Sequence, residues 1–190
     1  VALAVSELAG LPIEDALAGI AHVVVPGRLQ RIDEGQDYLA IVDYAHKPAA
    51  VAAVIATLRS EIKGRLCVVL GAGGDRDASK RAIMGREAAR GSDLFIVTDD
   101  NPRSEDPAVI RAAVEAGAYE LPTEERGEVR NIGDRAAAIR AAIAWAEPGD
   151  AVLVAGKGHE TGQNVNGVIH HFDDREEVRA ALQERRTGSL

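Results

Sequence analysis

Four polar clusters follow short apolar runs, and their side chains are of kinds that bind charged small molecules. The clusters are Asp43–His46, Gly71–Asp77, Asp99–Arg103 and Gly156–Glu160. A guanidinium can hold a carboxylate through two parallel hydrogen bonds, and carboxylate or amide oxygens can hold an ammonium. Because arginine, aspartate, asparagine and glutamate occur together in these clusters, the sequence indicates a site for a ligand that carries both groups.

The cluster that ends at Arg103 is the most specific of the four. Pro102 fixes its own φ and disfavours the α region for Asn101, so the side-chain directions of this loop are set in advance. Such a stiff loop suits recognition, with Arg103 holding a carboxylate while Asp100 and Asn101 hold an ammonium. A purely structural alternative is an Asx-type turn that caps a helix beginning at Pro107.

The glycine-rich clusters match none of the standard phosphate or zinc motifs. A dinucleotide fingerprint requires a third glycine where this chain has Arg76, and a P-loop requires glycine where it has Ala151. Gln163 stands where a zincin motif has its second histidine. Arg76 is nevertheless a candidate carboxylate clamp, because glycines beside it let the backbone approach a ligand; the alternative is a flexible turn. Glu160 is a candidate for binding an ammonium.

Neither a nucleophile nor a metal centre is predicted. Cys67 is embedded in an apolar run, and the chain has no Gly-x-Ser-x-Gly elbow. His170 and His171 are adjacent on an expected strand, where successive side chains point to opposite faces, so they do not form a metal site.

Composition places the chain among globular proteins that bind neither nucleic acid nor membranes. Its 190 residues are 46% hydrophobic and 27% charged, with 30 acidic against 22 basic residues and only 3% aromatic residues. That balance argues against a broad phosphate-coating surface. No apolar stretch of about 18 residues occurs. A single cysteine rules out an intrachain disulfide and fits a reducing compartment, so the protein is predicted to be cytoplasmic.

Short β-rich runs alternate with alanine-rich segments of helical spacing from residue 38 onward. Strands are expected at 38–43, 65–70, 93–98, 128–132 and 151–155. Helices are expected at 48–59, 80–90, 107–118, 134–146 and 174–186, with a hairpin over 163–172. The alternation predicts an α/β, Rossmann-like fold, in which a mostly parallel sheet has helices on both faces. All four polar clusters would then lie at the carboxyl edge of the sheet, where ligands bind.

Residues 1–24 do not share this alternation. They contain two short apolar-periodic segments divided at Leu11-Pro12, and Val25–Arg28 is expected to be a linker. The segment begins in mid-pattern without methionine, so we expect it to be the remnant of another domain. Residues 25–190 are expected to form a domain of their own.

Taken together in order, the motifs resemble those of a known family. The chain carries Pro-Gly-Arg at 26–28, Asp-Tyr-Ala-His at 43–46, Gly-Gly-Asp-Arg-Asp at 73–77, Asp-Asn-Pro-Arg at 100–103 and Gly-Lys-Gly-His-Glu at 156–160. This series is similar to the C-terminal part of the diaminopimelate-adding Mur ligases. The resemblance extends from about Val25 to Leu182, and it departs at Lys47, where the family commonly has threonine.

The resemblance implies an ATP-dependent ligase with a UDP-sugar domain, a central ATPase domain and a Rossmann-like C-terminal domain. Residues 1–24 would be a remnant of the central domain. The implied reaction adds meso-diaminopimelate to UDP-MurNAc-L-Ala-D-Glu in peptidoglycan biosynthesis through an acyl phosphate, with ATP and Mg²⁺ as cofactors. The 190-residue chain contains no P-loop motif. It is therefore expected to bind no cofactor and catalyse nothing alone, which ADP formation would refute.

The resemblance also carries over binding roles residue by residue, but no catalytic residue and no metal ligand. Six residues are assigned to meso-diaminopimelate: Arg76, Asp100, Asn101, Arg103, Gly156 and Glu160. Arg103 is expected to hold the carboxylate at the D-configured end of the ligand. Arg28 matches a position near the ATP phosphates, Asp43 one at the ribose hydroxyls, and His46 is expected to shape the same nucleotide edge.

Two alternatives remain open. A lysine-adding or folylpolyglutamate-type ligase domain would have the same fold, but its substrate would not require Arg103. A non-catalytic amino-acid-binding module would share the loops without a need for Arg28 or Asp43.

Overall fold

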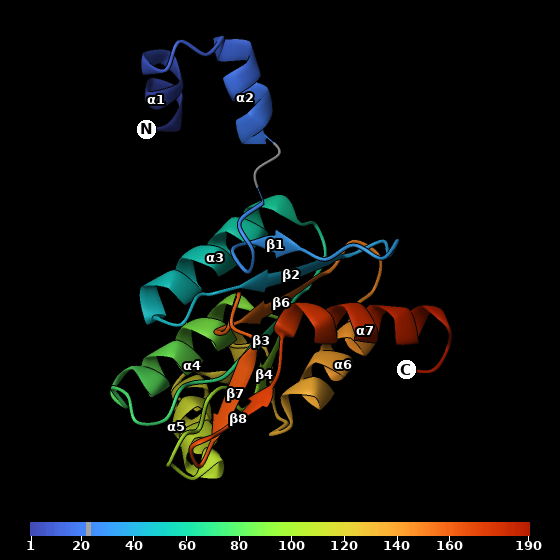
Figure 1. Cartoon of the computed structure of the whole chain (residues 1–190). Helices are drawn as coiled ribbons and strands as arrows, with labels where there is room; N and C mark the ends of the chain where they lie inside the picture. Colours follow the sequence, from blue (N-terminus) through green and yellow to red (C-terminus); the bar gives the residue numbers. More distant parts are fainter. Residues whose placement is uncertain (22–23) are drawn as a thin grey trace.

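A computed structural model describes residues 1–21 and 24–190, and its main body is a sheet between two layers of helices (Figure 1). The sheet order is β1-β2-β6-β3-β4-β5. Its strands are β1 (Gln30–Arg31), β2 (Leu39–Asp43), β3 (Leu66–Leu70), β4 (Leu94–Val97), β5 (Glu128–Asn131) and β6 (Ala151–Ala155). Strands β2 to β6 run parallel, and β1 pairs antiparallel with β2. The two-residue β1 was not predicted, because so short a strand has no periodicity.

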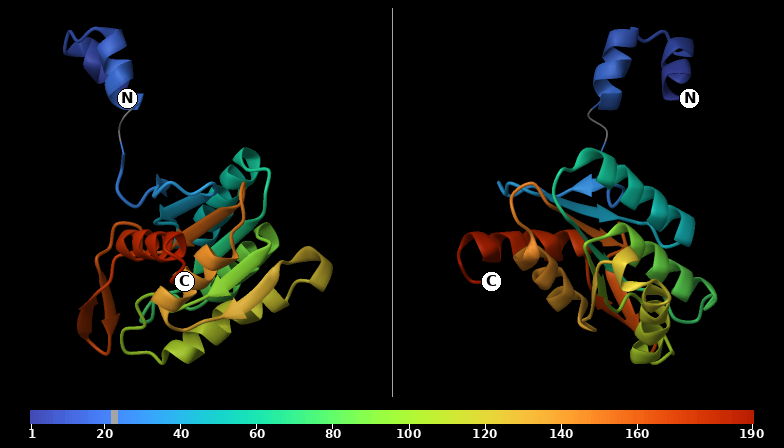
Figure 2. Two further views of the ribbon diagram at one scale, coloured as in Figure 1. Left: turned by 90° about the vertical axis from the view of Figure 1, so that its right-hand side faces the viewer. Right: turned by 180° about the vertical axis from the view of Figure 1, so that it is seen from behind.

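Helices cover both faces of the sheet (Figures 1 and 2). One face packs against α3 to α5 and the other against α6 and α7. These helices are α3 (Pro48–Glu61), α4 (Lys80–Gly91), α5 (Pro107–Tyr119), α6 (Arg135–Trp145) and α7 (Asp174–Arg186), with a short 3-10 helix η1 (Thr123–Glu125). The predicted fold class is confirmed, and each expected strand and helix of the body is present within two residues.

Local sequence explains where these elements begin and why the strands are buried. The five residues of β3 are all fully buried, as expected for a parallel strand covered on both faces. Helices α5 and α6 begin after Asp106 and Asp134, whose carboxylates accept hydrogen bonds from the N–H groups of Ala108 and Ala137 at 2.8 Å. Each aspartate therefore acts as the N-cap of its helix.

Strand β6 lies between β2 and β3, although it comes last in the sheet along the chain. The chain leaves β3 toward α4 on one face, whereas it leaves β6 toward α7 on the other face. Loops that depart to opposite faces open a crevice at the carboxyl ends of the two strands. The topology thus places the candidate site beyond the ends of β3 and β6.

The predicted hairpin is a separate two-stranded sheet of β7 (Gly162–Val165) and β8 (Val168–His171). Its turn uses Asn166 and Gly167, both with positive φ, which asparagine and glycine adopt most readily. The hairpin pairs with the loop after β4 through Arg103, whose N–H donates to the carbonyl of Asn164 at 2.9 Å. This attachment brings the hairpin to the edge of the crevice.

The N-terminal segment contains α1 (Ala2–Leu8) and α2 (Ile13–Ala21), which contact each other. Two short helices were predicted here, and His22 and Val23 of the expected 1–24 segment lie outside the described residues. Its assignment to another domain stays a prediction. None of the described helices is both long and apolar enough to cross a membrane.

Candidate functional site

A cavity of about 240 Å³ lies at the carboxyl edge of the sheet, and residues from all four polar clusters line it. All six residues expected to bind an amino acid are among them: Arg76, Asp100, Asn101, Arg103, Gly156 and Glu160. His46 also lines the cavity, whereas Arg28 and Asp43 do not. The fold therefore gathers all the residues predicted to bind an amino acid around one cavity, but only one of the three residues predicted to lie at a nucleotide.

Arg103 lies on one side of the cavity in a conformation that the surrounding loops hold. Its φ is +53°, in the left-handed region that is uncommon for residues other than glycine. The hairpin fixes this backbone, since the Arg103 carbonyl accepts from Asn166 N–H at 2.7 Å. Its guanidinium Nη1 donates to the carbonyl of Gly74 at 2.7 Å. A Cβ at Gly73 would lie 2.9 Å from the same Nη1, so a side chain there would displace the guanidinium from this position.

Neither Arg103 nor Arg76 forms an ion pair with an acid in the described part of the chain. Arg76 is exposed, and its Nη1 lies 3.4 Å from the carbonyl of Asp75. The nearby Arg81, in contrast, is buried and pairs with Glu105 at 2.8 Å. Hydrogen bonds from Arg81 lower the pKa of Glu105. The two cavity guanidiniums are thus available for carboxylates of a ligand.

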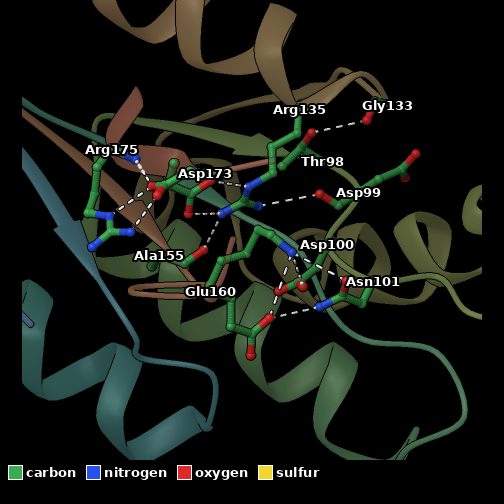
Figure 3. A network of polar contacts seen from close by, with 12 residues as sticks. Thr98, Asp99, Asp100, Asn101, Gly133, Arg135, Ala155, Glu160, Asp173 and Arg175 are labelled. Carbon is green, nitrogen blue, oxygen red and sulfur yellow. Dashed lines mark hydrogen bonds and ion pairs between the residues drawn. The ribbon is translucent and has the colours of Figure 1, made fainter. Parts of the chain in front are cut away.

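The cavity wall also has an acidic side around Asn101, where Asp100 and Glu160 lie near its side chain (Figure 3). The Asn101 Nδ2 donates to Oε2 of Glu160 at 3.0 Å, and its Oδ1 accepts from Asn164 N–H at 2.9 Å. Asp100 and Asn101 are both buried. Asp106 caps α5 through its own carboxylate, and the Asn101 side chain contacts Glu160 instead of the helix.

Gly156 allows the loop after β6 to touch the loop after β4. Its φ is +117°, and a Cβ there would lie 2.7 Å from Oδ2 of Asp100. Glycine is therefore required both by the backbone conformation and by the space.

A buried lysine lies under the acidic side and was not predicted. Lys157 has a fully buried side chain, and its Nζ is 3.3 Å from Oδ1 of Asn101, 3.6 Å from Oδ1 of Asp100 and 3.8 Å from Oε2 of Glu160. Burial lowers the pKa of Lys157, and the Asp100 carboxylate partly opposes this. The signal in the sequence was a lysine between two glycines directly after an apolar strand, which was considered only as a P-loop lysine.

A buried ion pair behind the site was also missed. Arg135 binds Asp174 through Nε at 2.7 Å and Nη2 at 2.8 Å, and both side chains are fully buried. The guanidinium also donates to the carbonyls of Ala155 at 2.9 Å and Asp99 at 3.4 Å, the residues that precede the two binding loops (Figure 3). Burial disfavours the charged guanidinium, but the Asp174 carboxylate outweighs this and raises the pKa of Arg135.

The residues expected at a nucleotide gather around Tyr44. The Arg28 guanidinium lies 4.2 Å from the centre of the Tyr44 ring, and the His46 ring contacts it edge-on at 4.6 Å. Asp43 accepts backbone N–H groups on both carboxylate oxygens, from Leu29 at 2.7 Å and Ala45 at 2.8 Å. Asp43 therefore orders the chain around Arg28, and the ring of Tyr44, which was not singled out, joins the cluster.

The side chains near the C-terminal histidines are engaged in other contacts. His171 Nε2 lies 2.7 Å from Oε2 of Glu176, and this contact raises the pKa of His171. Asp173 pairs with Arg175. No cluster of three or more potential metal-binding side chains occurs in residues 1–21 and 24–190. Cys67 is fully buried, as predicted, and burial raises the pKa of its thiol.

Comparisons with known proteins agree with this geometry. The family described as Mur ligase, glutamate ligase domain, matches residues 27–158. The chain is 62% identical to the UDP-N-acetylmuramoyl-L-alanyl-D-glutamate–2,6-diaminopimelate ligase of Corynebacterium glutamicum, covering 100% of the chain and 37% of that protein. It is 57% identical to the ligase of the same name from Streptomyces avermitilis, covering 93% of the chain and 35% of that protein.

Solved structures show the same relationship. A structure of a ligase with this name superposes with a TM-score of 0.78 at 39% identity, covering 97% of the chain and 37% of the solved protein. Escherichia coli FolC superposes with a TM-score of 0.60 at 24% identity, over 98% of the chain and 39% of its own length, which shows the fold alone. The chain thus spans about a third of the length of the curated relatives it matches. From the family match and these identities, the chain belongs to the Mur ligase family and contains its glutamate ligase domain.

Proposed function

We propose that this chain supplies the amino-acid site of an ATP-dependent ligase that joins meso-diaminopimelate to UDP-MurNAc-L-Ala-D-Glu in peptidoglycan biosynthesis. Relatives named for this activity are 48% to 65% identical to the chain. The observation that carries the proposal is the cavity, whose lining includes two guanidiniums without acidic partners among the described residues and the carboxylates of Asp100 and Glu160.

The cavity complements an amino acid with two zwitterionic ends. At the D-configured end, Arg103 receives the carboxylate while Asp100 and Glu160 receive the ammonium. Arg76 extends from the loop after β3 and receives the carboxylate of the other end. Gly156 leaves room for the ligand backbone beside Asp100. Lysine lacks the distal carboxylate and would leave Arg103 without a partner, so the site selects diaminopimelate.

The nucleotide side of the proposal rests on the cluster around Tyr44. ATP with Mg²⁺ would supply the phosphoryl group that activates the acceptor carboxylate as an acyl phosphate, which the amine of the amino acid then attacks. The exposed guanidinium of Arg28 fits a contact with phosphate, and Tyr44 and His46 of this cluster also line the cavity. Asp43 already accepts two backbone N–H groups, so any contact with ribose hydroxyls uses its remaining lone pairs. In this scheme the chain provides binding groups, and the ATPase machinery lies elsewhere.

A titration followed by NMR tests the amino-acid assignment. We expect meso-diaminopimelate to shift the amide signals of Asp100–Arg103 and Gly156, and L-lysine to bind more weakly. Arg103→Ala should weaken binding about 30-fold or more, because truncating one partner of a buried charged pair costs about 2–5 kcal/mol. Arg186→Ala, at an exposed position on α7, is the matched control and should leave binding unchanged. Equal affinity for lysine, or full affinity in Arg103→Ala, would overturn the assignment.

A further inference from the structure

Lys157 contacts three residues that line the cavity, yet it is not itself part of the cavity wall. Its side chain is fully buried, and Nζ lies within 4 Å of oxygens of Asp100, Asn101 and Glu160 (Figure 3 shows these three side chains converging). A buried ammonium is unfavourable unless it is paired, and an apolar side chain would fill the same volume without that penalty. The contacts therefore need an explanation other than packing.

We propose that Lys157 is a positioning residue that orients Asp100, Asn101 and Glu160 to receive the ligand ammonium, and so determines selectivity for an amino acid with an ammonium at that end. The inference rests on the proposed function, because it deepens the role of the same cavity. It adds a residue that does not touch the ligand but acts through three that do.

The first step concerns the orientation of the Asn101 amide. Its Oδ1 accepts hydrogen bonds from the Nζ of Lys157 and the N–H of Asn164. Rotating the amide by half a turn would place its NH₂ group against two donors, which is unfavourable. The Nδ2 is consequently held toward Glu160, to which it donates at 3.0 Å.

The second step concerns the carboxylates. Lys157 and Asn101 both contact Oε2 of Glu160, which leaves Oε1 without a partner among the described residues. Lys157 approaches Oδ1 of Asp100, while Oδ2 of Asp100 lies over Gly156 at the cavity wall. Each acid thus has one oxygen held from below by Lys157 and a second oxygen left for a ligand.

The third step concerns charge. Lys157 places one positive charge between two carboxylates, so the cluster has one negative charge left, which matches one ammonium. The other buried charges nearby, Arg135 and Asp174, neutralise each other. Without Lys157 the two carboxylates would repel each other and lose their fixed orientation.

The test compares two ligands in two variants. L-2-aminopimelate keeps both carboxylates of meso-diaminopimelate but lacks the ammonium at the D-configured end. The chain should prefer meso-diaminopimelate by about 10-fold or more, because charge-assisted hydrogen bonds to the distal ammonium are lost with the analogue. In Lys157→Met this preference should fall to about 2-fold or less, with the affinity for L-2-aminopimelate little changed. Lys63→Met, an exposed lysine at the opposite edge of the sheet, should keep the preference.

The outcomes separate the two levels of the proposal. A Lys157→Met variant that keeps the preference, or that weakens both ligands equally, overturns the positioning role and leaves the proposed function standing. If the chain binds neither ligand, the proposed function fails and the inference fails with it. Should Lys157→Met not fold, the ¹⁵Nζ signal of Lys157 in the unaltered chain decides: it should shift with meso-diaminopimelate and stay with L-2-aminopimelate. Equal shifts, or none with bound meso-diaminopimelate, would contradict the inference.

Discussion

The buried ion pair between Arg135 and Asp174 should make the domain sensitive to the loss of either partner alone. Both side chains are fully buried, so Arg135→Met leaves the Asp174 carboxylate without a counterion in the interior. Removing one partner of such a pair costs about 3–5 kcal/mol. We expect the upper part of this range, because the carbonyls of Ala155 and Asp99 also lose their donor. A domain of this size should then unfold roughly 8–20 °C lower.

Urea unfolding followed by circular dichroism measures this effect. The matched control is Arg31→Met, because Arg31 and Asp33 form an ion pair at 3.2 Å with side chains 55% and 53% exposed. Its loss should cost no more than about 1 kcal/mol. The double variant Arg135→Met/Asp174→Leu should recover much of the stability, since it leaves no unpaired charge. The reasoning is refuted if Arg135→Met costs no more than the control, or if the double variant is as unstable as the two single losses added together.

Two further predictions concern pH and helix packing. Burial raises the pKa of Asp150, but hydrogen bonds from Arg65 outweigh this effect and hold the pKa below its ordinary value. The stabilisation that the Asp150 carboxylate provides is therefore lost as pH falls through the pKa of the folded state. Urea unfolding across pH should show that Asp150→Asn costs about 1–3 kcal/mol at neutral pH and progressively less below about pH 4. Gly117→Ala should cost about 1–3 kcal/mol, because its Cβ would lie 1.8 Å from the Ala82 carbonyl; Gly19→Ala, with open space around it, should be neutral or stabilising in thermal unfolding.

The fold class could be predicted because each of the five parallel strands has a local signal. Leu66–Leu70 is a continuous apolar run, and α3 and α5 begin at proline, so neither feature depends on distant residues. The order of the strands depends on tertiary packing instead. Nothing within Ala151–Ala155 indicates that this strand inserts between β2 and β3. The two-residue β1 was missed for lack of length.

The candidate site was predictable to the extent that its residues occupy loops after strands. The sequence indicated six residues that would bind an amino-acid ligand, and the fold gathers all of them around one cavity. Lys157 and Arg135 were missed because both appear in sequence as ordinary charged residues at a loop and a helix start. Their burial arises only when the loops after β4 and β6 converge with α7. The boundary between residues 1–24 and 25–190 stays a prediction.

A crystal structure of the chain with bound meso-diaminopimelate would reveal the proposed contacts themselves. We expect Arg103 to pair with the distal carboxylate and Oε1 of Glu160 to contact the neighbouring ammonium, with Lys157 still beneath them. An Arg103 side chain that points into solvent, or that is held by an acid of its own chain while the ligand lies elsewhere, would contradict it.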